Sequence, residues 1–160
     1  MSTVVYPGSF NPITFGHANI VERGLKLFDH VVVAIGTSAD KDPDIELHDR
    51  IELCREALKD FGTHVSVEGF NTLLVEFVRK HDTRFVLRGL RTVTDYDYEF
   101  QMLEMNQALD PSIEYVLLPT SNEWSHVSST RVREIASYGG DVSAFVAPCV
   151  VKYYQRLNAI

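Results

Sequence analysis

The chain has 160 residues, with 15 lysines and arginines against 22 aspartates and glutamates, so its formal net charge is −7 with histidine neutral. With 45% hydrophobic and 23% charged residues, a chain of this length can bury a packed core, and disordered, collagen-like and coiled-coil proteins are excluded. The acidic balance also argues against nonspecific nucleic-acid binding, which depends on lysine and arginine.

The two cysteines, Cys54 and Cys149, lie far apart and neither belongs to a C-x-x-C motif. This spacing argues against a structural zinc site and is typical of a reducing compartment. No stretch reaches the roughly 18 consecutive apolar residues of a membrane span. We therefore expect a cytoplasmic protein with no membrane partner, folded as a single domain over residues 1–160.

Short β-branched runs alternate along the chain with longer segments of helical periodicity, which predicts a parallel sheet covered by helices. Strands are expected at residues 3–6, 31–35, 65–67, 85–87 and 115–118. Apolar residues at helical spacing, each set forming one stripe toward the sheet, occur at residues 21–28, 47–61, 96–103, 128–136 and 151–157. The expected fold is α/β, a Rossmann-like doubly wound parallel five-stranded sheet of order 3-2-1-4-5 with a C-terminal helical segment.

The first functional motif is a turn-rich segment between the first strand and a helix, Pro7-Gly8-Ser9-Phe10-Asn11-Pro12-Ile13-Thr14-Phe15-Gly16-His17. Its glycines allow close backbone approach, and the helix start attracts anions. The segment matches neither G-x-G-x-x-G nor a Walker motif. His17 at the helix start could donate to a phosphate oxygen, although a lone histidine there is more often a capping or exposed residue.

Three cations follow the second and fourth expected strands. Lys41 ends the segment Gly36-Thr37-Ser38-Ala39-Asp40-Lys41, and Arg88 and Arg91 belong to Arg88-Gly89-Leu90-Arg91. Each alone could be solvated surface charge. Since the carboxyl ends of parallel strands meet at one edge, we expect the three to join His17 in a phosphate-binding cluster.

Three consecutive hydroxyl residues, Ser128-Ser129-Thr130, stand at a helix start after the last strand. One hydroxyl is enough for an N-cap, which is worth about 1 kcal/mol. The others, with the free N–H groups of the first turn, predict a second anion site, and two such sites suit a triphosphate. A capping box over residues 94–97 is expected to begin an earlier helix, with Glu99 in its first turn.

These motifs resemble those of the bacterial phosphopantetheine adenylyltransferases of the nucleotidyltransferase superfamily. The resemblance extends over nearly the whole chain and rests on Gly8-Ser9-Phe10-Asn11-Pro12, Thr14-Phe15-Gly16-His17, Arg88-Gly89-Leu90-Arg91 and Trp124-Ser125-His126-Val127-Ser128-Ser129-Thr130-Arg131-Val132-Arg133. The element Arg88–Arg91 followed by Asp95-Tyr96-Asp97-Tyr98-Glu99 narrows it to this family. Asn11 stands where the family usually has aspartate.

The resemblance implies reversible transfer of adenylate from ATP to 4′-phosphopantetheine, giving dephospho-coenzyme A and pyrophosphate, with His17, Lys41 and Arg88 as catalytic residues. It assigns ATP binding to Ser9, Phe10, His17, Gly89, Leu90, Arg91, Glu99, Trp124, Ser125, His126, Val127, Ser128, Ser129 and Thr130. It assigns phosphopantetheine binding to Ser9, Lys41, Leu73, Leu74 and Arg88. Mg²⁺ would arrive with ATP and need no protein ligand, the assembly would be a homohexamer, and coenzyme A would be a feedback ligand.

Two other functions remain open from the residues. One is nucleotide transfer to another phosphorylated acceptor, as in a cytidylyltransferase or a mononucleotide adenylyltransferase. The other is a noncatalytic nucleotide-binding module, which would bind ATP without releasing pyrophosphate. No Ser/His/Asp or Cys/His grouping predicts a covalent nucleophile, so the expected chemistry is positioning and charge stabilisation.

Overall fold

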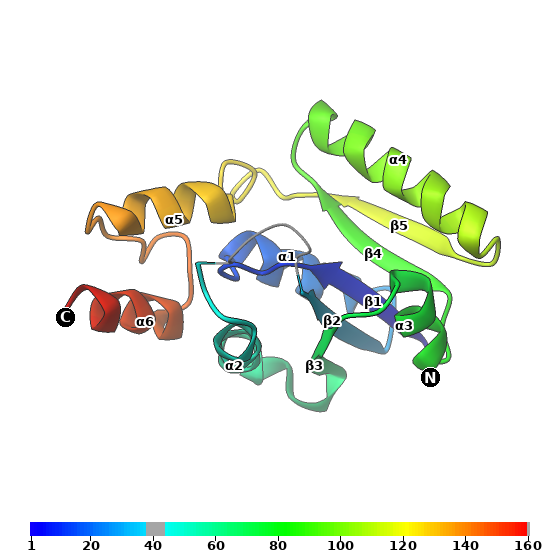
Figure 1. The fold of residues 1–160 in the computed structure, drawn as a ribbon, viewed down its shortest axis with the longest axis horizontal. Helices are drawn as coiled ribbons and strands as arrows, with labels where there is room; N and C mark the ends of the chain where they lie inside the picture. Colours follow the sequence, from blue (N-terminus) through cyan, green and yellow to red (C-terminus); the bar gives the residue numbers. More distant parts are fainter. Residues whose placement is uncertain (38–43, 160) are drawn as a thin grey trace.

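The computed structural model describes residues 1–37 and 44–159. Within them, five strands form one parallel sheet of order β3-β2-β1-β4-β5 (Figure 1). The strands are β1 (Thr3–Gly8), β2 (His30–Gly36), β3 (Val65–Phe70), β4 (Phe85–Leu90) and β5 (Glu114–Pro119). The predicted strands and their order are confirmed, and each observed strand is longer than predicted by one to three residues at an end.

Both faces of the sheet are covered, which explains why the central strands are continuously apolar. Alternate residues of the same strands enter two separate core clusters: Val4 and Val33 lie in one, Val5 and Val32 in the other. The first cluster takes in residues of α1 (Phe15–Gly24), α2 (Leu47–Ala57), α5 (Ser129–Ser137) and α6 (Pro148–Asn158), and the second takes in residues of α3 (Leu74–Lys80). A 3₁₀ helix, η1 (Lys59–His64), continues from α2 to β3.

The helix starts are set by the residues that cap them. Ser128 is the N-cap of α5, with its side chain accepting from the N–H of Arg131, and Pro148 occupies the first turn of α6. The helix start expected at Ser128 is confirmed. The capping box of α4 (Val93–Leu109), however, is formed by Thr92 and Asp95, two residues earlier than predicted. Glu99 therefore lies in the second turn of α4, where it is buried.

The prediction that the apolar residues at 96–103 of α4 face the sheet is wrong. Tyr96 and Phe100 stack on each other yet remain 47% and 42% exposed, while the buried residues of this helix are Glu99 and Asn106. The reason is that α4 is attached to the sheet by polar bonds: Glu99 binds Arg88 of β4, and Asn106 donates to the hydroxyl of Tyr115 of β5.

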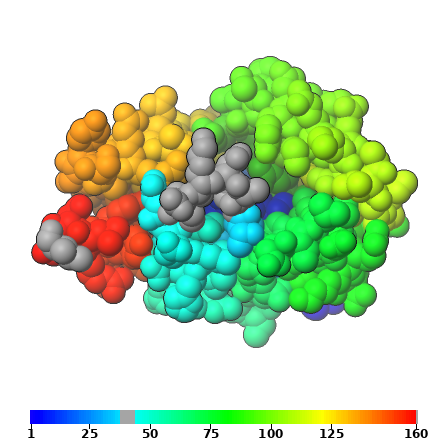
Figure 2. Space-filling view, in the orientation of Figure 1, coloured from blue at the N-terminus to red at the C-terminus, as the bar shows by residue number. Residues whose placement is uncertain are grey.

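The sheet order places a switch point between β1 and β4, because the chain winds in opposite directions from these two neighbours. Ligands of open parallel sheets bind outside the carboxyl ends of the strands at such a point. In Figure 2, blue atoms of the N-terminal region are visible at the bottom of a hollow between α4 and the α2–α3 side. No helix in the described part of the chain is long and apolar enough to cross a membrane.

Candidate functional site

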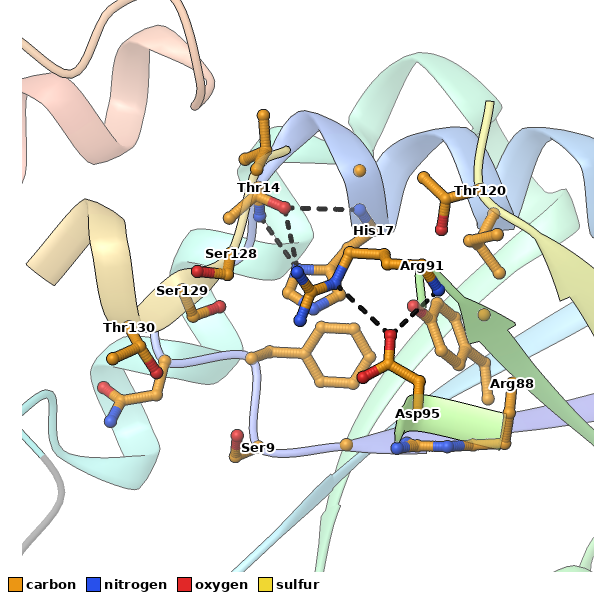
Figure 3. A pocket seen from close by; sticks show the side chains of 18 of the residues that line it. Ser9, Thr14, His17, Arg88, Arg91, Asp95, Thr120, Ser128, Ser129 and Thr130 are labelled. Carbon is orange, nitrogen blue, oxygen red and sulfur yellow. Dashed lines mark hydrogen bonds and ion pairs between the residues drawn. The ribbon is translucent and has the colours of Figure 1, made fainter. Parts of the chain in front are cut away.

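A cavity of about 550 Å³ lies at the switch point. Its wall includes eleven of the residues predicted from the sequence, namely Ser9, Phe10, His17, Arg88, Gly89, Arg91, Glu99, Val127, Ser128, Ser129 and Thr130. Figure 3 shows Ser128, Ser129 and Thr130 on one side, Arg88, Arg91 and Asp95 on the other, and His17 between them. Residues more than 100 positions apart in the sequence thus share one space.

His17 is oriented by a capping box at the start of α1. The N–H of Thr14 donates to His17 Nδ1 over 3.0 Å, and the hydroxyl of Thr14 accepts from the N–H of His17 over 3.4 Å. A backbone N–H can only donate, so Nδ1 carries no proton in the neutral ring. The proton of the neutral imidazole is therefore on Nε2, the nitrogen left free to donate into the cavity.

The surroundings keep this imidazole neutral. Burial, followed by the charges of Arg88 and Arg91, lowers the pKa of His17 to about 3. The ring also packs against Phe10, at 4.9 Å between ring centroids. Phe10 is 2% exposed and adopts a positive φ of 47°. Gly8 makes room for it, because a Cβ there would lie 2.9 Å from the Phe10 ring.

Arg88 is held at the end of β4 by a buried carboxylate. Its Nη2 donates to Glu99 Oε1 over 2.7 Å and its Nε donates to Glu99 Oε2 over 2.9 Å, while Nη1 donates to the carbonyl of Pro7. Burial alone would lower the pKa of Arg88, but the hydrogen bonds and charge of Glu99 outweigh it and raise that pKa. Glu99, predicted to contact ATP, thus uses its oxygens to orient Arg88.

Arg91 is less constrained than Arg88, whereas the start of α5 is fixed by hydrogen bonds. The Nε of Arg91 lies 3.8 Å from Asp95 Oδ2, a long ion pair, and its backbone N–H donates to the same oxygen over 2.9 Å. Ser128 caps α5, and Ser129 Oγ donates to the carbonyl of Pro12 over 2.8 Å, which ties α5 to the loop after β1. The hydroxyl residues at the start of α5, where a second anion site is predicted, lie across the cavity from Arg88 and Arg91 (Figure 3).

Several predicted residues are not part of the cavity wall. Trp124 packs on Phe15 at 5.1 Å between ring centroids, Ser125 Oγ donates to the carbonyl of Asn122, and His126 lies edge-on to Phe145. Leu90 ends β4 without lining the cavity. Lys41 lies outside the described residues.

A second cavity, of about 390 Å³, adjoins the first and shares Ser9, Arg88 and Glu99 with it. Its wall also includes apolar or aromatic residues from four elements: Phe70, Leu74, Tyr98, Met102 and Tyr115. Leu74 therefore belongs to a cavity wall, whereas Leu73 is the 55% exposed N-cap of α3 and not a helix-core residue.

The sequence analysis missed two arginines of the main cavity, Arg50 and Arg133. Arg133 donates to the carbonyl of Asn11 over 2.6 Å and pairs with Asp44 over 2.9 Å. Asn11 Oδ1 accepts from the N–H of Ile45 over 3.2 Å, a bond that an aspartate oxygen could equally accept. The departure from the family pattern at Asn11 thus leaves this loop contact intact.

The described part of the chain contains no group of three or more histidine, cysteine, aspartate or glutamate side chains placed to hold a metal. The donors in the main cavity are cations, hydroxyls, an imidazole N–H and backbone N–H groups, a set that suits anionic oxygens. The arrangement can bind phosphate groups from several sides and stabilise negative charge between them.

Comparison with known proteins gives a consistent result. The sequence pattern of the cytidylyltransferase-like family matches residues 5–135. The chain is 46% identical over 160 residues to the phosphopantetheine adenylyltransferase of Hahella chejuensis, covering 100% of this chain and 99% of that one. It is also 46% identical over 152 residues to that of Coxiella burnetii, covering 95% and 94%.

A solved structure from Vibrio parahaemolyticus, named provisionally as a nicotinate-nucleotide adenylyltransferase, superposes with a TM-score of 0.65 at 19% identity. The match covers 97% of this chain and 99% of that one. At this identity the likeness concerns the fold alone, and it agrees with the predicted doubly wound sheet.

Proposed function

Because this chain belongs to the phosphopantetheine adenylyltransferases of the cytidylyltransferase-like family, we propose that it transfers adenylate from ATP to 4′-phosphopantetheine, giving dephospho-coenzyme A and pyrophosphate. The enzyme is an adenylyltransferase of coenzyme A biosynthesis, and residues 1–160 form its one nucleotidyltransferase domain. Nothing in the described structure favours the noncatalytic alternative.

One observation carries the proposal: a neutral imidazole with its N–H on Nε2 stands between the two arginines Arg88 and Arg91 and the hydroxyl residues at the start of α5. The bond from Thr14 to Nδ1 fixes this tautomer, and the lowered pKa keeps the ring uncharged. A fixed donor of this kind stabilises charge that develops on a transferring phosphoryl group. A site for simple nucleotide storage would not need it.

The triphosphate would lie along the main cavity. Arg91 and the turn Ser128–Thr130 would bind the β- and γ-phosphates, and His17 Nε2 would donate to the α-phosphate. Ser9, Phe10 and Gly89 line the same space and would contact the nucleotide. Mg²⁺ would enter as part of the MgATP substrate, bound mainly by phosphates and water.

The acceptor would occupy the junction of the two cavities. Arg88 lines both, so its guanidinium, oriented by Glu99, would hold the acceptor phosphate, with Lys41 as a second cation. The adjoining cavity, with Leu74, Met102 and Tyr98 in its wall, would receive the pantetheine arm. Leu73 would contact the acceptor at the entrance.

The reaction is an in-line displacement at the α-phosphorus. An oxygen of the acceptor phosphate forms the new P–O bond, the bond from the α-phosphorus to the bridging oxygen breaks, and pyrophosphate leaves with that electron pair. The attacking oxygen is already anionic, so no general base is required. The residues act by holding two polyanions together and by neutralising the charge that builds between them.

The outer face of α4 supports self-association. Val93, Tyr96 and Phe100 are 80%, 47% and 42% exposed. Such a cluster of large apolar side chains is typical of a protein interface. We propose that the protein forms a homohexamer in which these α4 faces are covered. We also propose that it is cytoplasmic and that coenzyme A competes with the substrates for the cavity as a feedback ligand.

The decisive measurement is pyrophosphate release from MgATP, with and without 4′-phosphopantetheine. We expect release that depends on phosphopantetheine and falls when CTP replaces ATP. Release with CTP and another phosphorylated acceptor would indicate a related nucleotidyltransferase. ATP binding without any release would indicate a noncatalytic module.

A further inference from the structure

Arg50 is the largest of the fully enclosed side chains, at 2% exposed, although arginine is almost never buried without a charged partner. It stands in the first turn of α2 and lines the main cavity. The functional assignments above give it no role.

The guanidinium of Arg50 connects three separate backbone segments. Nε donates to the carbonyl of Ile45 over 2.9 Å, and Nη1 donates to the carbonyls of Ser9 over 2.8 Å and Gly36 over 3.2 Å. Ser9 follows β1 and Gly36 ends β2. One planar group therefore fixes the carboxyl ends of two neighbouring strands against the segment before α2.

Arg50 forms no ion pair with a carboxylate among residues 1–37 and 44–159, and the charge of Glu46 opposes only in part the lowering of the Arg50 pKa by burial. In the same cavity Arg88 is paired with Glu99, Arg133 with Asp44 and, at longer range, Arg91 with Asp95. Arg50 has only carbonyl acceptors among the described residues, and its Nη2 has none there. Burying an unpaired guanidinium is unfavourable in general. A polyanion in the main cavity, which Arg50 lines, would offset this penalty.

We propose that Arg50 is a positioning residue of adenylate transfer. It holds Ser9 after β1 and Gly36 at the end of β2 in the geometry that receives the substrate phosphates, and it adds positive charge to the cavity wall. This inference rests on the proposed function for the identity of the polyanion. It assigns two separable effects to one side chain. The charge favours binding of phosphate groups, and the fork of N–H donors fixes the loop that carries Ser9.

The charge is tested by comparing ATP with adenosine in the Arg50→Met variant, using calorimetric titration. We expect ATP affinity to fall about tenfold or more, as for loss of a buried charged partner, and adenosine affinity to change less than about twofold. Equal losses for ATP and adenosine would mean a merely structural role and overturn the inference. Arg55→Met is the matched control, since Arg55 lies on the same helix and is paired with Glu52 on the surface.

The positioning effect of the planar guanidinium is tested with Arg50→Lys. This variant also tests the inference if Arg50→Met does not fold. Lysine keeps the charge but cannot reproduce the planar donor geometry. We expect ATP affinity within about threefold of the unmodified enzyme and kcat reduced about tenfold or more. An unchanged kcat in Arg50→Lys would overturn the positioning role. Absence of phosphopantetheine-dependent pyrophosphate release from the unmodified enzyme would instead refute the proposed function, while the ATP and adenosine comparison would still report on Arg50.

Discussion

Replacing His17 by glutamine should remove a specific part of the enzyme's sensitivity to acid. Burial and two nearby arginines lower the pKa of His17 to about 3, whereas in the unfolded chain a histidine has a pKa of about 6.5. As pH falls below the unfolded value, the unfolded chain gains a proton that the folded ring does not accept. Folded stability is therefore intact above about pH 6.5 and is lost progressively down to the folded pKa.

The magnitude follows from linkage. At pH 5 the unfolded histidine is stabilised by protonation by about 2 kcal/mol, while the folded ring with a pKa of about 3 gains almost nothing. At pH 7.5 the stabilisation by protonation of His17 is close to zero in both the unfolded and the folded state. Between these two pH values the unmodified enzyme should therefore lose about 2 kcal/mol more stability than the glutamine variant.

Urea unfolding at each pH measures this difference directly. Trp124 is the single tryptophan and packs on Phe15 at the start of α1, so its fluorescence reports on the structure around the site. The exposed His48 provides the control, since His48→Gln should leave the pH dependence unchanged. An equal loss of stability in the unmodified enzyme and His17→Gln would refute the neutral, buried state of His17, and with it the donor role of Nε2.

Further substitutions test the remaining roles. His17→Ala should lower kcat about 10²–10³-fold with little change in the dissociation constant for ATP, because a transition-state donor is lost; a rise in KM alone would make His17 an anchor. Arg88→Ala should raise KM for phosphopantetheine far more than KM for ATP, measured in the same steady-state assay. Glu99→Gln should reduce the free energy of unfolding by about 3–5 kcal/mol in urea titrations, since Arg88 would lose its charged partner. Phe100→Glu should shift the assembly toward smaller species in sedimentation velocity, and an unchanged distribution would exclude the α4 face as an interface.

The fold could be predicted from the sequence because its signals are local. Strand residues such as Val31–Ile35 are apolar without interruption, and only a sheet covered on both faces buries such a run. The strand order then followed from the few topologies that right-handed crossovers allow. The cap at Ser128 and the proline at 148 similarly act within one turn of helix, so their effects are visible in a few consecutive letters.

The interior of the site could be predicted only in part, because its geometry depends on contacts between distant residues. The sequence indicated Arg88 and Glu99 separately, but their pairing requires the packing of α4 on β4. A signal was present in α4: Glu99 and Asn106 are seven residues apart and therefore share a face, which predicts a polar inner face and leaves the aromatic residues outside. Helical periodicity of the apolar residues alone gave the opposite orientation.

The partners of Arg50 could not be predicted from the sequence either, because most of them are distant from it along the chain. Arg50 follows Leu47 by three residues and precedes Cys54 by four, so it shares the helix face of these two residues. An arginine on such a face needs several acceptors, and the sequence contains no pattern that identifies carbonyls as those acceptors. The carbonyls belong to Ser9, Gly36 and Ile45 and converge only when β1, β2 and α2 are assembled.

The arginines of the cavity differ in how closely each is paired with a carboxylate. This difference affects how firmly the enzyme would hold each of its two polyanionic substrates. Arg88 is paired with a buried carboxylate, so its orientation is fixed before the acceptor arrives. Arg91 has a long contact of 3.8 Å with Asp95 and can turn toward a phosphate at little cost. In the proposed reaction, such a site would hold the acceptor phosphate rigidly while the triphosphate side adjusts, and rigidity at the attacking oxygen is what in-line displacement demands.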